Sequence, residues 1–345
     1  MKYCIYTRLY YESPYILFFI EHYIKLGFDK IIILKSDNII FNNTFENNVD
    51  IYNVNNDENK LLSIYTKFIK NTKYDWVLIV DIDEILFLNP KYNTINDYVQ
   101  NKLIKNSDIN TFYFRWAMLE KYDNFEINSF KSLLNDYTMF QNSHIKSMVK
   151  ISSLKSVYHP HLCELNEDNC IYFENNILNK QIAHNHLINK LSYKETILVH
   201  IHTRNLNNLI LKSFTTNLGN NNNVIPKQIK NKLHFVHFIN NFDFENIKYE
   251  ILLKQFKSLI GLKATLPFTH SRTKEIDFKS LDYKINNYQN KFVNYPEEKQ
   301  ILEKVLIENN INIKNFYRIL DILSIYIYKT NYFMKIIHKK IVNID

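Results

Sequence analysis

Three carboxylates interrupt an apolar stretch early in the chain. In "YDWVLIVDIDEILFL", residues 74–88, Asp81, Asp83 and Glu84 separate two apolar runs. A solvated turn would normally contain Gly, Asn, Ser or Pro, whereas this one contains Ile82. Burying unpaired carboxylates is strongly unfavourable. The sequence therefore predicts that a cation accompanies these carboxylates.

The spacing of the carboxylates indicates which cation would suit them. In an extended chain Asp81 and Asp83 project to one face and Glu84 projects to the other. Two carboxylates on one face suit a divalent cation such as Mg²⁺ or Mn²⁺, which keeps coordination positions for substrate phosphates. The alternative is a plain turn between two strands, in which Glu84 pairs with a Lys or Arg.

Alternating strand and helix patterns lead up to the carboxylates. Ser13, Pro14 and Gly27 mark the start and the end of the first helix. A strand, a helix and a second strand imply a right-handed parallel crossover, and its repetition predicts a doubly wound α/β sheet with ligands at the carboxyl ends of the strands. The expected strands are residues 2–7, 29–38, 49–54 and 75–83, and the expected helices are 13–27 and 59–72.

From residue 111 the pattern changes to that of added antiparallel strands, and beyond about residue 205 it becomes mainly helical. We expect a first domain at residues 1–210 and a helical C-terminal region at 211–345. The further strands are predicted at 111–119, 143–151, 156–161 and 195–203, and the helices at 248–261, 297–310 and 315–341.

Composition narrows the class of protein. The 345 residues are 46% hydrophobic and carry a net charge of +8, but the basic residues are dispersed, so we expect no nucleic-acid partner. The three cysteines are too few for a disulfide framework; Cys163 and Cys170 could pair, but a reducing compartment is the simpler interpretation.

No apolar run reaches the roughly 18 residues of a membrane span, and the N-terminus lacks the apolar core of a signal peptide. The sequence thus predicts a soluble, cytoplasmic protein. Residues 325–342 are basic and amphipathic, so peripheral membrane contact stays open beside packing against the catalytic domain or a second subunit.

Three blocks in order carry a resemblance to a known family. "ESPYILFFIEHYIKLGFDKIIILKSDN", the carboxylate stretch and "ILVHIHTRN" together resemble nucleotide-sugar glycosyltransferases of the GT-A fold, in the family 2-like and family 92-like group. The likeness covers roughly residues 3–213. It implies a Rossmann-like mixed sheet with helices on both faces, and transfer of a hexose from a nucleotide sugar, a UDP-sugar above all, to a glycan or protein acceptor.

The resemblance implies a Mn²⁺ or Mg²⁺ cofactor. It assigns Asp81 to the ribose and the metal and Asp83 to the metal, with His200 as a further metal ligand and Arg204 beside the diphosphate. The block "ILVHIHTRN", which contains His200 and Arg204, departs from the family pattern at Ile201 and at Asn205. A competing imidazole at His202 and a purely structural role for His200 therefore stay open.

Further residues follow from the same resemblance. Lys146 resembles a basic residue of the family, with a solvated Lys as an equal alternative. Arg8 could instead be a surface charge, and Ser36 and Asp37 a mere turn. The positions expected to contact the nucleotide are Thr7, Arg8, Glu12, Ser36 and Asp37.

An inverting transferase needs a carboxylate as general base near the acceptor hydroxyl. Glu120 is the candidate, with Asp123 and Asp136 as rivals; if transfer retains configuration, no dedicated base is required. We expect Trp116 to be an acceptor platform and Trp76 a core residue.

Other interpretations stay open at this point. Residues 158–170 contain imidazoles, thiols and acids, but their spacing fits no common zinc motif, which favours an acceptor-side loop. A metal-dependent phosphohydrolase or nucleotidyltransferase would also use an Asp-x-Asp element. A non-catalytic module that binds a sugar or a partner is the third possibility. The donor sugar, the acceptor and the oligomeric state stay undetermined.

Overall fold

The computed structural model describes residues 1–37, 47–54, 58–119, 139–159, 161–181, 193–201, 275–276, 295–308 and 310–318. The chain forms two compact units. One comprises residues 1–120, 128–202 and 272–294, and the other comprises 121–127, 203–271 and 295–345. The predicted boundary near residue 210 lies outside the described residues and stays a prediction.

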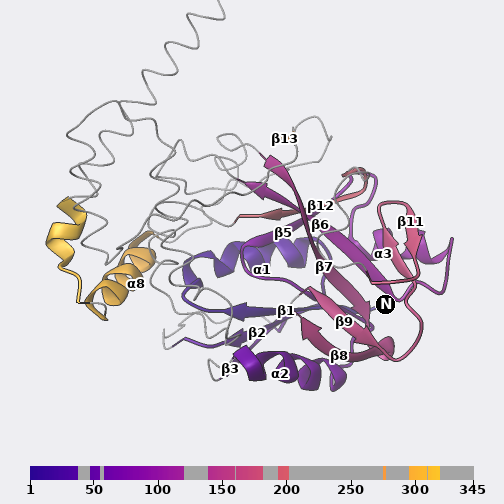
Figure 1. Cartoon of the computed structure of the whole chain (residues 1–345), viewed down its shortest axis with the longest axis horizontal. Coiled ribbons are helices and arrows are strands. Elements are labelled where there is room, and N and C mark those ends of the chain that lie inside the picture. Colours follow the sequence, from indigo (N-terminus) through magenta and orange to yellow (C-terminus); the bar gives the residue numbers. More distant parts are fainter. Residues whose placement is uncertain are drawn as a thin grey trace, which may run out of the picture. The chain divides into compact units, whose positions relative to one another are not determined.

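The first unit is built on a mixed sheet with helices on both faces, which confirms the predicted α/β class (Figure 1). Its parallel part has the order β3-β2-β1-β4, with β1 in contact with both β2 and β4. These elements fall where the sequence places them. They are β1 (Tyr3–Leu9), η1 (Ser13–Tyr15), α1 (Ile16–Lys25), β2 (Lys30–Lys35), β3 (Val49–Asn53), α2 (Glu58–Lys70) and β4 (Trp76–Ile79).

Beyond β4 the sheet continues with β7, which runs antiparallel to both β4 and β6, and then with β6, β10 and β11, of which β10 runs parallel to β6. β12 pairs with β5 and β6, and β8 and β9 form a separate hairpin. The bounds are β5 (Glu84–Leu88), β6 (Thr111–Leu119), β7 (Met139–Lys150), η2 (Ile151–Ser153), β8 (Leu154–His159), β9 (Leu162–Leu165), β10 (Ile171–Phe173), β11 (Asn176–Leu178), β12 (Thr196–His200) and β13 (Glu275–Ile276).

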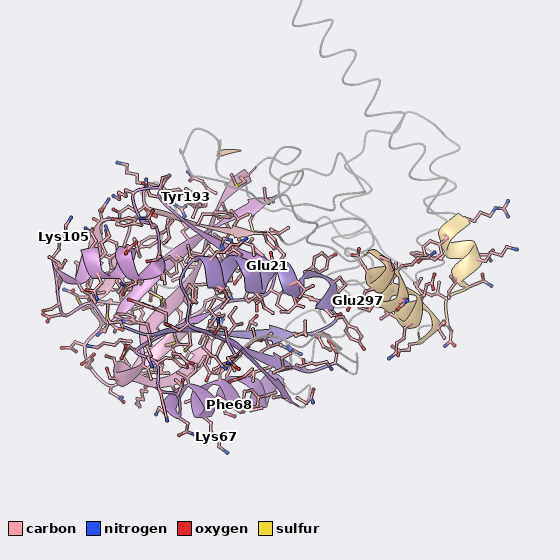
Figure 2. All side chains as sticks on the ribbon, turned by 180° about the vertical axis from the view of Figure 1, so that it is seen from behind. Glu21, Lys67, Phe68, Lys105, Tyr193 and Glu297 are labelled. Carbon is pink, nitrogen blue, oxygen red and sulfur yellow. The ribbon has the colours of Figure 1, made fainter. Side chains whose placement is uncertain are left out.

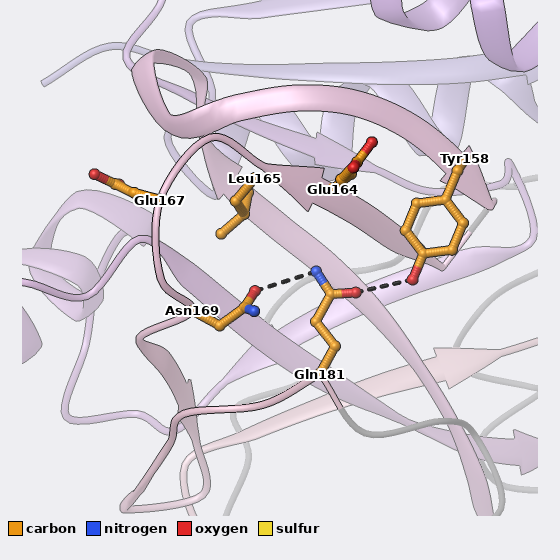
Figure 3. A pocket seen from close by; sticks show the side chains of 6 residues that line it. All are labelled: Tyr158, Glu164, Leu165, Glu167, Asn169 and Gln181. Atoms are coloured by element: carbon orange, nitrogen blue, oxygen red, sulfur yellow. Dashed lines mark hydrogen bonds between the residues drawn. The ribbon is translucent and has the colours of Figure 1, made fainter.

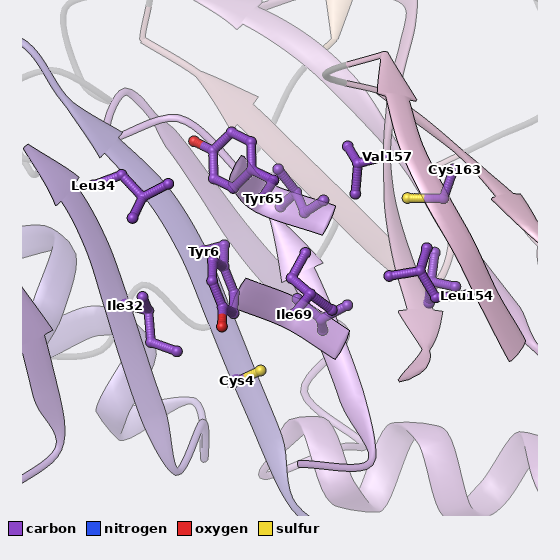
Figure 4. Packing of buried hydrophobic residues seen from close by; sticks show 12 residues of the cluster. Cys4, Tyr6, Ile32, Leu34, Tyr65, Ile69, Leu154, Val157 and Cys163 are labelled. Atoms are coloured by element: carbon purple, nitrogen blue, oxygen red, sulfur yellow. The ribbon is translucent and has the colours of Figure 1, made fainter. Parts of the chain in front are cut away.

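Alternate residues of β1 pack into the apolar cores on the two faces of the sheet. Cys4 and Tyr6 lie in a cluster with Tyr65 and Ile69 of α2 and with residues of the β8–β9 hairpin (Figure 4). Tyr3 points to the other face, where its ring lies edge-on to Phe28. On the outer side of α2 the side chain of Lys67 points away from the sheet (Figure 2). The buried apolar strands are thus covered on both faces, as parallel strands require.

One helix of the first unit was not predicted. α3 (Ile95–Leu103) begins with a capping box in which Thr94 accepts from the backbone N–H of Asp97 and Asp97 accepts from that of Thr94. Gly27 has a φ of +94° and lies against Thr94, so the left-handed turn after α1 allows close approach of the start of α3. The Thr-x-x-Asp spacing was the available sequence signal.

The described part of the second unit is helical. α8 (Tyr295–Glu308) matches the predicted helix at 297–310, and residues 313–318 are also helical. The predicted helix at 248–261 and most of that at 315–341 lie outside the described residues. Among the helices that the structure describes, none is long and apolar enough to cross a membrane.

A buried carboxylate joins α3, β10 and the start of β12. Glu195 accepts hydrogen bonds from Lys102 at 2.7 Å, from Tyr172 at 2.6 Å and from Lys91 at 3.0 Å. Burial alone would raise the pKa of Glu195, but these hydrogen bonds lower it to about 2. Lys102 is only 2% exposed, so its ammonium is not solvated and depends on Glu195 as its counter-ion.

Glu195→Gln should lower the free energy of unfolding by about 3 kcal/mol, because it leaves a buried ammonium without its counter-ion. The lowered pKa means that the carboxylate stabilises the fold above about pH 4.5 and that this contribution is lost as the pH falls toward 2. Urea unfolding across that window should therefore show a weaker pH dependence in the variant. Glu164→Gln removes an exposed carboxylate paired with Lys155 and is the control; an equal loss in both variants would contradict the prediction.

Candidate functional site

The predicted carboxylates lie in a tight turn between β4 and β5, residues Asp81–Glu84, which we call the carboxylate turn. The Glu84 amide donates to the Asp81 carbonyl at 3.0 Å, and the Glu84 carboxylate accepts from the Asp81 amide at 2.9 Å. The expectation that Asp81 and Asp83 share one face while Glu84 points away is therefore wrong. It assumed an extended chain, whereas a turn with an i to i+3 hydrogen bond brings the first and fourth residues together.

Lys146 of β7 supplies a cation to this turn. Its Nζ lies 2.9 Å from Oδ2 of Asp81 and 3.3 Å from Oε2 of Glu84. Lys146 is 1% exposed and Glu84 is fully buried, whereas the Asp81 side chain is 53% exposed. The solvated alternative for Lys146 is wrong, and the predicted counter-cation is a residue of the chain itself.

The charged groups in and beneath the turn shift one another's pKa. Partial desolvation by the surrounding chain would raise the pKa of Asp81, but the adjacent Lys146 ammonium outweighs it, and the pKa of Asp81 is lowered. Burial would lower the pKa of Lys146, but Asp81 and Glu84 raise it. For Glu84, burial dominates and raises the pKa well above its ordinary value. Lys146 and Asp81 are thus a charged pair at neutral pH.

Asp83 faces a different partner. Its Oδ1 lies 3.5 Å from Nε2 of His200, at the end of β12. The backbone carbonyl of Asp83 accepts from the Ile201 amide at 2.7 Å, and the antiparallel pairing of β5 and β12 sets His200 opposite Glu84. The structure therefore brings together two residues that the sequence assigns to the metal, although they are more than 100 positions apart.

α1 fixes the start of β5. The Tyr23 hydroxyl donates to the Glu84 carbonyl at 2.8 Å and accepts from the Leu86 amide at 3.2 Å. His22 Nε2 lies 2.7 Å from the Leu86 carbonyl, and burial lowers the pKa of His22 to about 4. A carbonyl oxygen only accepts, so Nε2 carries the proton of a neutral imidazole. The helix thus holds the backbone that presents the carboxylate turn.

The residues expected to contact the nucleotide gather where β1 and β2 end. Arg8 Nε donates to Ser36 Oγ at 2.9 Å, and its guanidinium lies 5.0 Å from the ring centroid of Tyr10. Thr7 is fully buried, and its hydroxyl has no hydrogen-bond partner within the described part of the chain. We call Thr7, Arg8 and Ser36 the strand-end cluster.

Asp37 and Glu12 make contacts with the local backbone. The Asp37 carboxylate accepts from the Tyr11 amide at 2.7 Å and lies 3.1 Å from the Lys35 ammonium, so it stabilises the local backbone. Glu12 precedes η1, and its carbonyl accepts from the Tyr15 amide at 3.0 Å. Their proposed roles at the nucleotide stay predictions.

The strand-end cluster and the carboxylate turn lie at the same end of the sheet. The Val80 amide donates to the Tyr6 carbonyl at 3.2 Å, which places the end of β4 beside that of β1. Burial raises the pKa of Tyr65, with Asp81 raising it further and Arg8 lowering it. The charges of Asp81 and Arg8 therefore both act on the Tyr65 hydroxyl. This places the two charged groups at the carboxyl ends of the parallel strands, which is where sheets of this kind bind ligands.

Trp116 is buried among imidazoles. Its ring lies 4.1 Å from that of His200, stacks on His144 at 4.9 Å and meets His161 edge-on at 5.1 Å. The indole is only 9% exposed, so the prediction of an acceptor platform at Trp116 is wrong: histidines cover the ring that a sugar would stack on. Trp76 is 1% exposed, as predicted for a core residue.

The sequence interpretation did not place His144 at this site, and it considered His161 only as part of the segment at 158–170. His144 Nδ1 lies 2.6 Å from Asn142 Oδ1, which also accepts the His144 amide, and His161 Nδ1 lies 2.6 Å from the Ile145 carbonyl. Because both partners accept, each Nδ1 carries a proton. The sequence signals were the His-x-Lys spacing of His144 and Lys146 and the imidazoles of residues 158–170.

A cavity of about 470 Å³ lies beside the β8–β9 hairpin (Figure 3). Two hydrogen bonds join residues of its lining: Tyr158 donates to Gln181 at 2.9 Å, and Gln181 donates to Asn169 at 3.2 Å. Cys163 of the same segment is a buried free thiol. Within the described residues no three His, Cys, Asp or Glu side chains gather to hold a metal ion.

Several predicted site residues lie outside the described residues. Their placement stays untested; they are Glu120, Asp123, Asp136, His202 and Arg204.

Tyr23→Phe should lower the free energy of unfolding by about 1–3 kcal/mol, because a buried carbonyl and a buried amide each lose their partner. Urea denaturation measures the change. Tyr158→Phe is the control, since Tyr158 is 51% exposed and water can replace its hydroxyl. A Tyr23 variant as stable as the control would show that α1 does not fix β5 through this hydroxyl.

Comparison with known proteins supports the sequence resemblance. No curated protein sequence matches the chain. Among solved structures, the chain is similar to the crystal structure of S. aureus TarS 1-349, at 12% identity and a TM-score of 0.29, over 75% of this chain and 79% of that one; so distant a likeness carries no argument about the site. Residues 68–235 match the sequence model of Glycosyltransferase family 92. This match includes the carboxylate turn, Lys146 and His200, and it supports the resemblance to a family 92-like group of GT-A-like glycosyltransferases.

Proposed function

We propose that the carboxylate turn and the strand-end cluster bind a nucleotide sugar together with Mn²⁺ or Mg²⁺, and that the enzyme transfers the sugar to a hydroxyl of a glycan or protein. A UDP-sugar is the proposed donor. The observation that carries the proposal is the Asp83–His200 pair at 3.5 Å, next to an Asp81 side chain that is 53% exposed. The family match supports sugar transfer in general.

The residues present fit a divalent cation that is completed by substrate. Mg²⁺ and similar ions are commonly bound by one or two protein carboxylates plus substrate phosphates and waters. Asp83 Oδ1 and His200 Nε2 are close enough together to bind one ion from adjacent positions. Such an ion would neutralise charge that develops on the leaving diphosphate.

The remaining groups have roles that match a nucleotide donor. Asp81 presents its exposed side chain beside the metal pair, where it would accept hydrogen bonds from the ribose hydroxyls. The Arg8 guanidinium and the Ser36 hydroxyl lie together at the end of β1 and would contact the base or ribose, with Thr7 beneath them. Arg204 is proposed to contact the diphosphate and Glu120 to act as general base toward the acceptor.

The alternatives fit the described residues less well. A phosphohydrolase or nucleotidyltransferase of the two-metal type needs a second carboxylate cluster, but Glu84 is fully buried and pairs with Lys146. A binding module without turnover would use the same donor contacts. It differs from a transferase only in lacking chemistry on the bound donor.

Donor binding is tested by thermal unfolding with a panel of UDP- and GDP-sugars, with and without Mn²⁺. A ligand at about 100 times its Kd should stabilise the native protein by about 2.7 kcal/mol, and Asp83→Asn should remove the Mn²⁺-dependent part. Asp75→Asn is the control, because this carboxylate lies before β4, where it accepts from the Lys2 amide. The proposal fails if no nucleotide sugar stabilises the wild type, or if Asp83→Asn responds as the control does.

A further inference from the structure

The pairing of Lys146 with Asp81 has a consequence for metal capture. We propose that Lys146 withholds Asp81 from the metal, so that Asp83 and His200 capture a divalent cation efficiently only together with the diphosphate of the donor. Lys146 is in this sense a positioning residue that acts through Asp81. The inference rests on the proposed function and adds the order in which its ligands assemble.

Lys146 is fixed in place from two sides. Its ammonium lies 2.9 Å from Asp81 and 3.3 Å from Glu84, in a position that is 1% exposed. Glu84 is fully buried and is held in turn by the Asp81 amide at 2.9 Å. Because a buried charge is strongly destabilised when its partner leaves, Glu84 keeps Lys146 beneath Asp81. Asp81 therefore stays oriented toward an ammonium.

This arrangement disfavours a metal on Asp81. One of its carboxylate oxygens already accepts from the Lys146 ammonium, and a divalent cation on the same carboxylate would meet a like charge at short range. Asp83 and His200 then remain as two protein ligands. Within the described part of the chain, no cluster of three ligating side chains is present.

A bound diphosphate would supply what the protein lacks. Two phosphate oxygens add ligands and negative charge, and they complete a coordination sphere begun by Asp83 and His200. The metal would thus stay in the site with the donor and leave with the released nucleoside diphosphate. A purely structural Lys146 would stabilise the turn but would leave the metal affinity unchanged.

Mn²⁺ titration followed by electron paramagnetic resonance, without nucleotide, tests the inference directly. The proteins compared are the wild type, Glu84→Gln as the matched control, and the double variant Lys146→Met with Glu84→Gln, which leaves no buried charge unpaired. We expect weak binding to the wild type and the control, and binding at least about tenfold tighter in the double variant, where Asp81 becomes a third ligand. Adding Asp81→Asn to the double variant should abolish the gain.

UDP supplies the second arm of the experiment. It should tighten Mn²⁺ binding at least about tenfold in the wild type and clearly less in the double variant, since the latter already has its third ligand. If the double variant does not fold, Lys146→Gln with Glu84→Gln keeps hydrogen-bonding atoms at both positions and should show the same gain.

Equal Mn²⁺ affinity of the wild type and the folded double variant would overturn the inference, as would tight binding by the wild type without nucleotide. Failure of the proposed function has a different signature, because the wild type would then respond to no nucleotide sugar in thermal unfolding.

Discussion

The buried ion pair beneath the carboxylate turn is the interaction on which the rest of the site depends. Lys146 reaches Asp81 and Glu84 because β7 runs antiparallel beside β4, with Leu78 opposite Met148. That register carries Lys146 just past the end of β4, under the turn. Without the ammonium, the Asp81 carboxylate would lose its charged partner, and nothing would oppose the burial that already raises the pKa of Glu84.

The neighbours of the turn follow from the same arrangement. α1 holds the backbone of β5 through Tyr23 and His22, while β12 approaches from the other side and sets His200 beside Asp83. Trp116 of β6 packs against His200 and limits its movement. Each metal-binding candidate is therefore supported by an element of regular structure, as positioned ligands require.

Much of the architecture was predictable because it depends on local patterns. The runs of branched residues in β1, β2 and β4 and the helical periodicity of α2 fix these elements, and the Thr94–Asp97 capping box would have revealed α3. The path of the carboxylate turn was not predictable from periodicity. A two-residue spacing has the same appearance in a strand and in a turn, although the two send the side chains in different directions.

The burial of Lys146 and Trp116 depends on contacts between distant segments. A lone Lys in a strand is usually solvated, and only the pairing of β4 with β7 makes Lys146 a buried partner of two carboxylates. Trp116 similarly acquires its cover from His144, His161 and His200, which belong to three other segments. Sequence predicted the residue types at the site, whereas the fold determined which of them meet.

Release of nucleoside diphosphate from a nucleotide sugar tests the central claim most directly. Glycosyltransferases commonly leak donor to water, so the wild type with Mn²⁺ and its stabilising UDP-sugar should release UDP over time without any acceptor. Asp83→Asn should reduce the rate by at least about tenfold, because the leaving diphosphate loses its metal. Stable binding of the donor with no release of UDP, with or without candidate acceptors, would contradict a transferase and indicate a sugar-binding module.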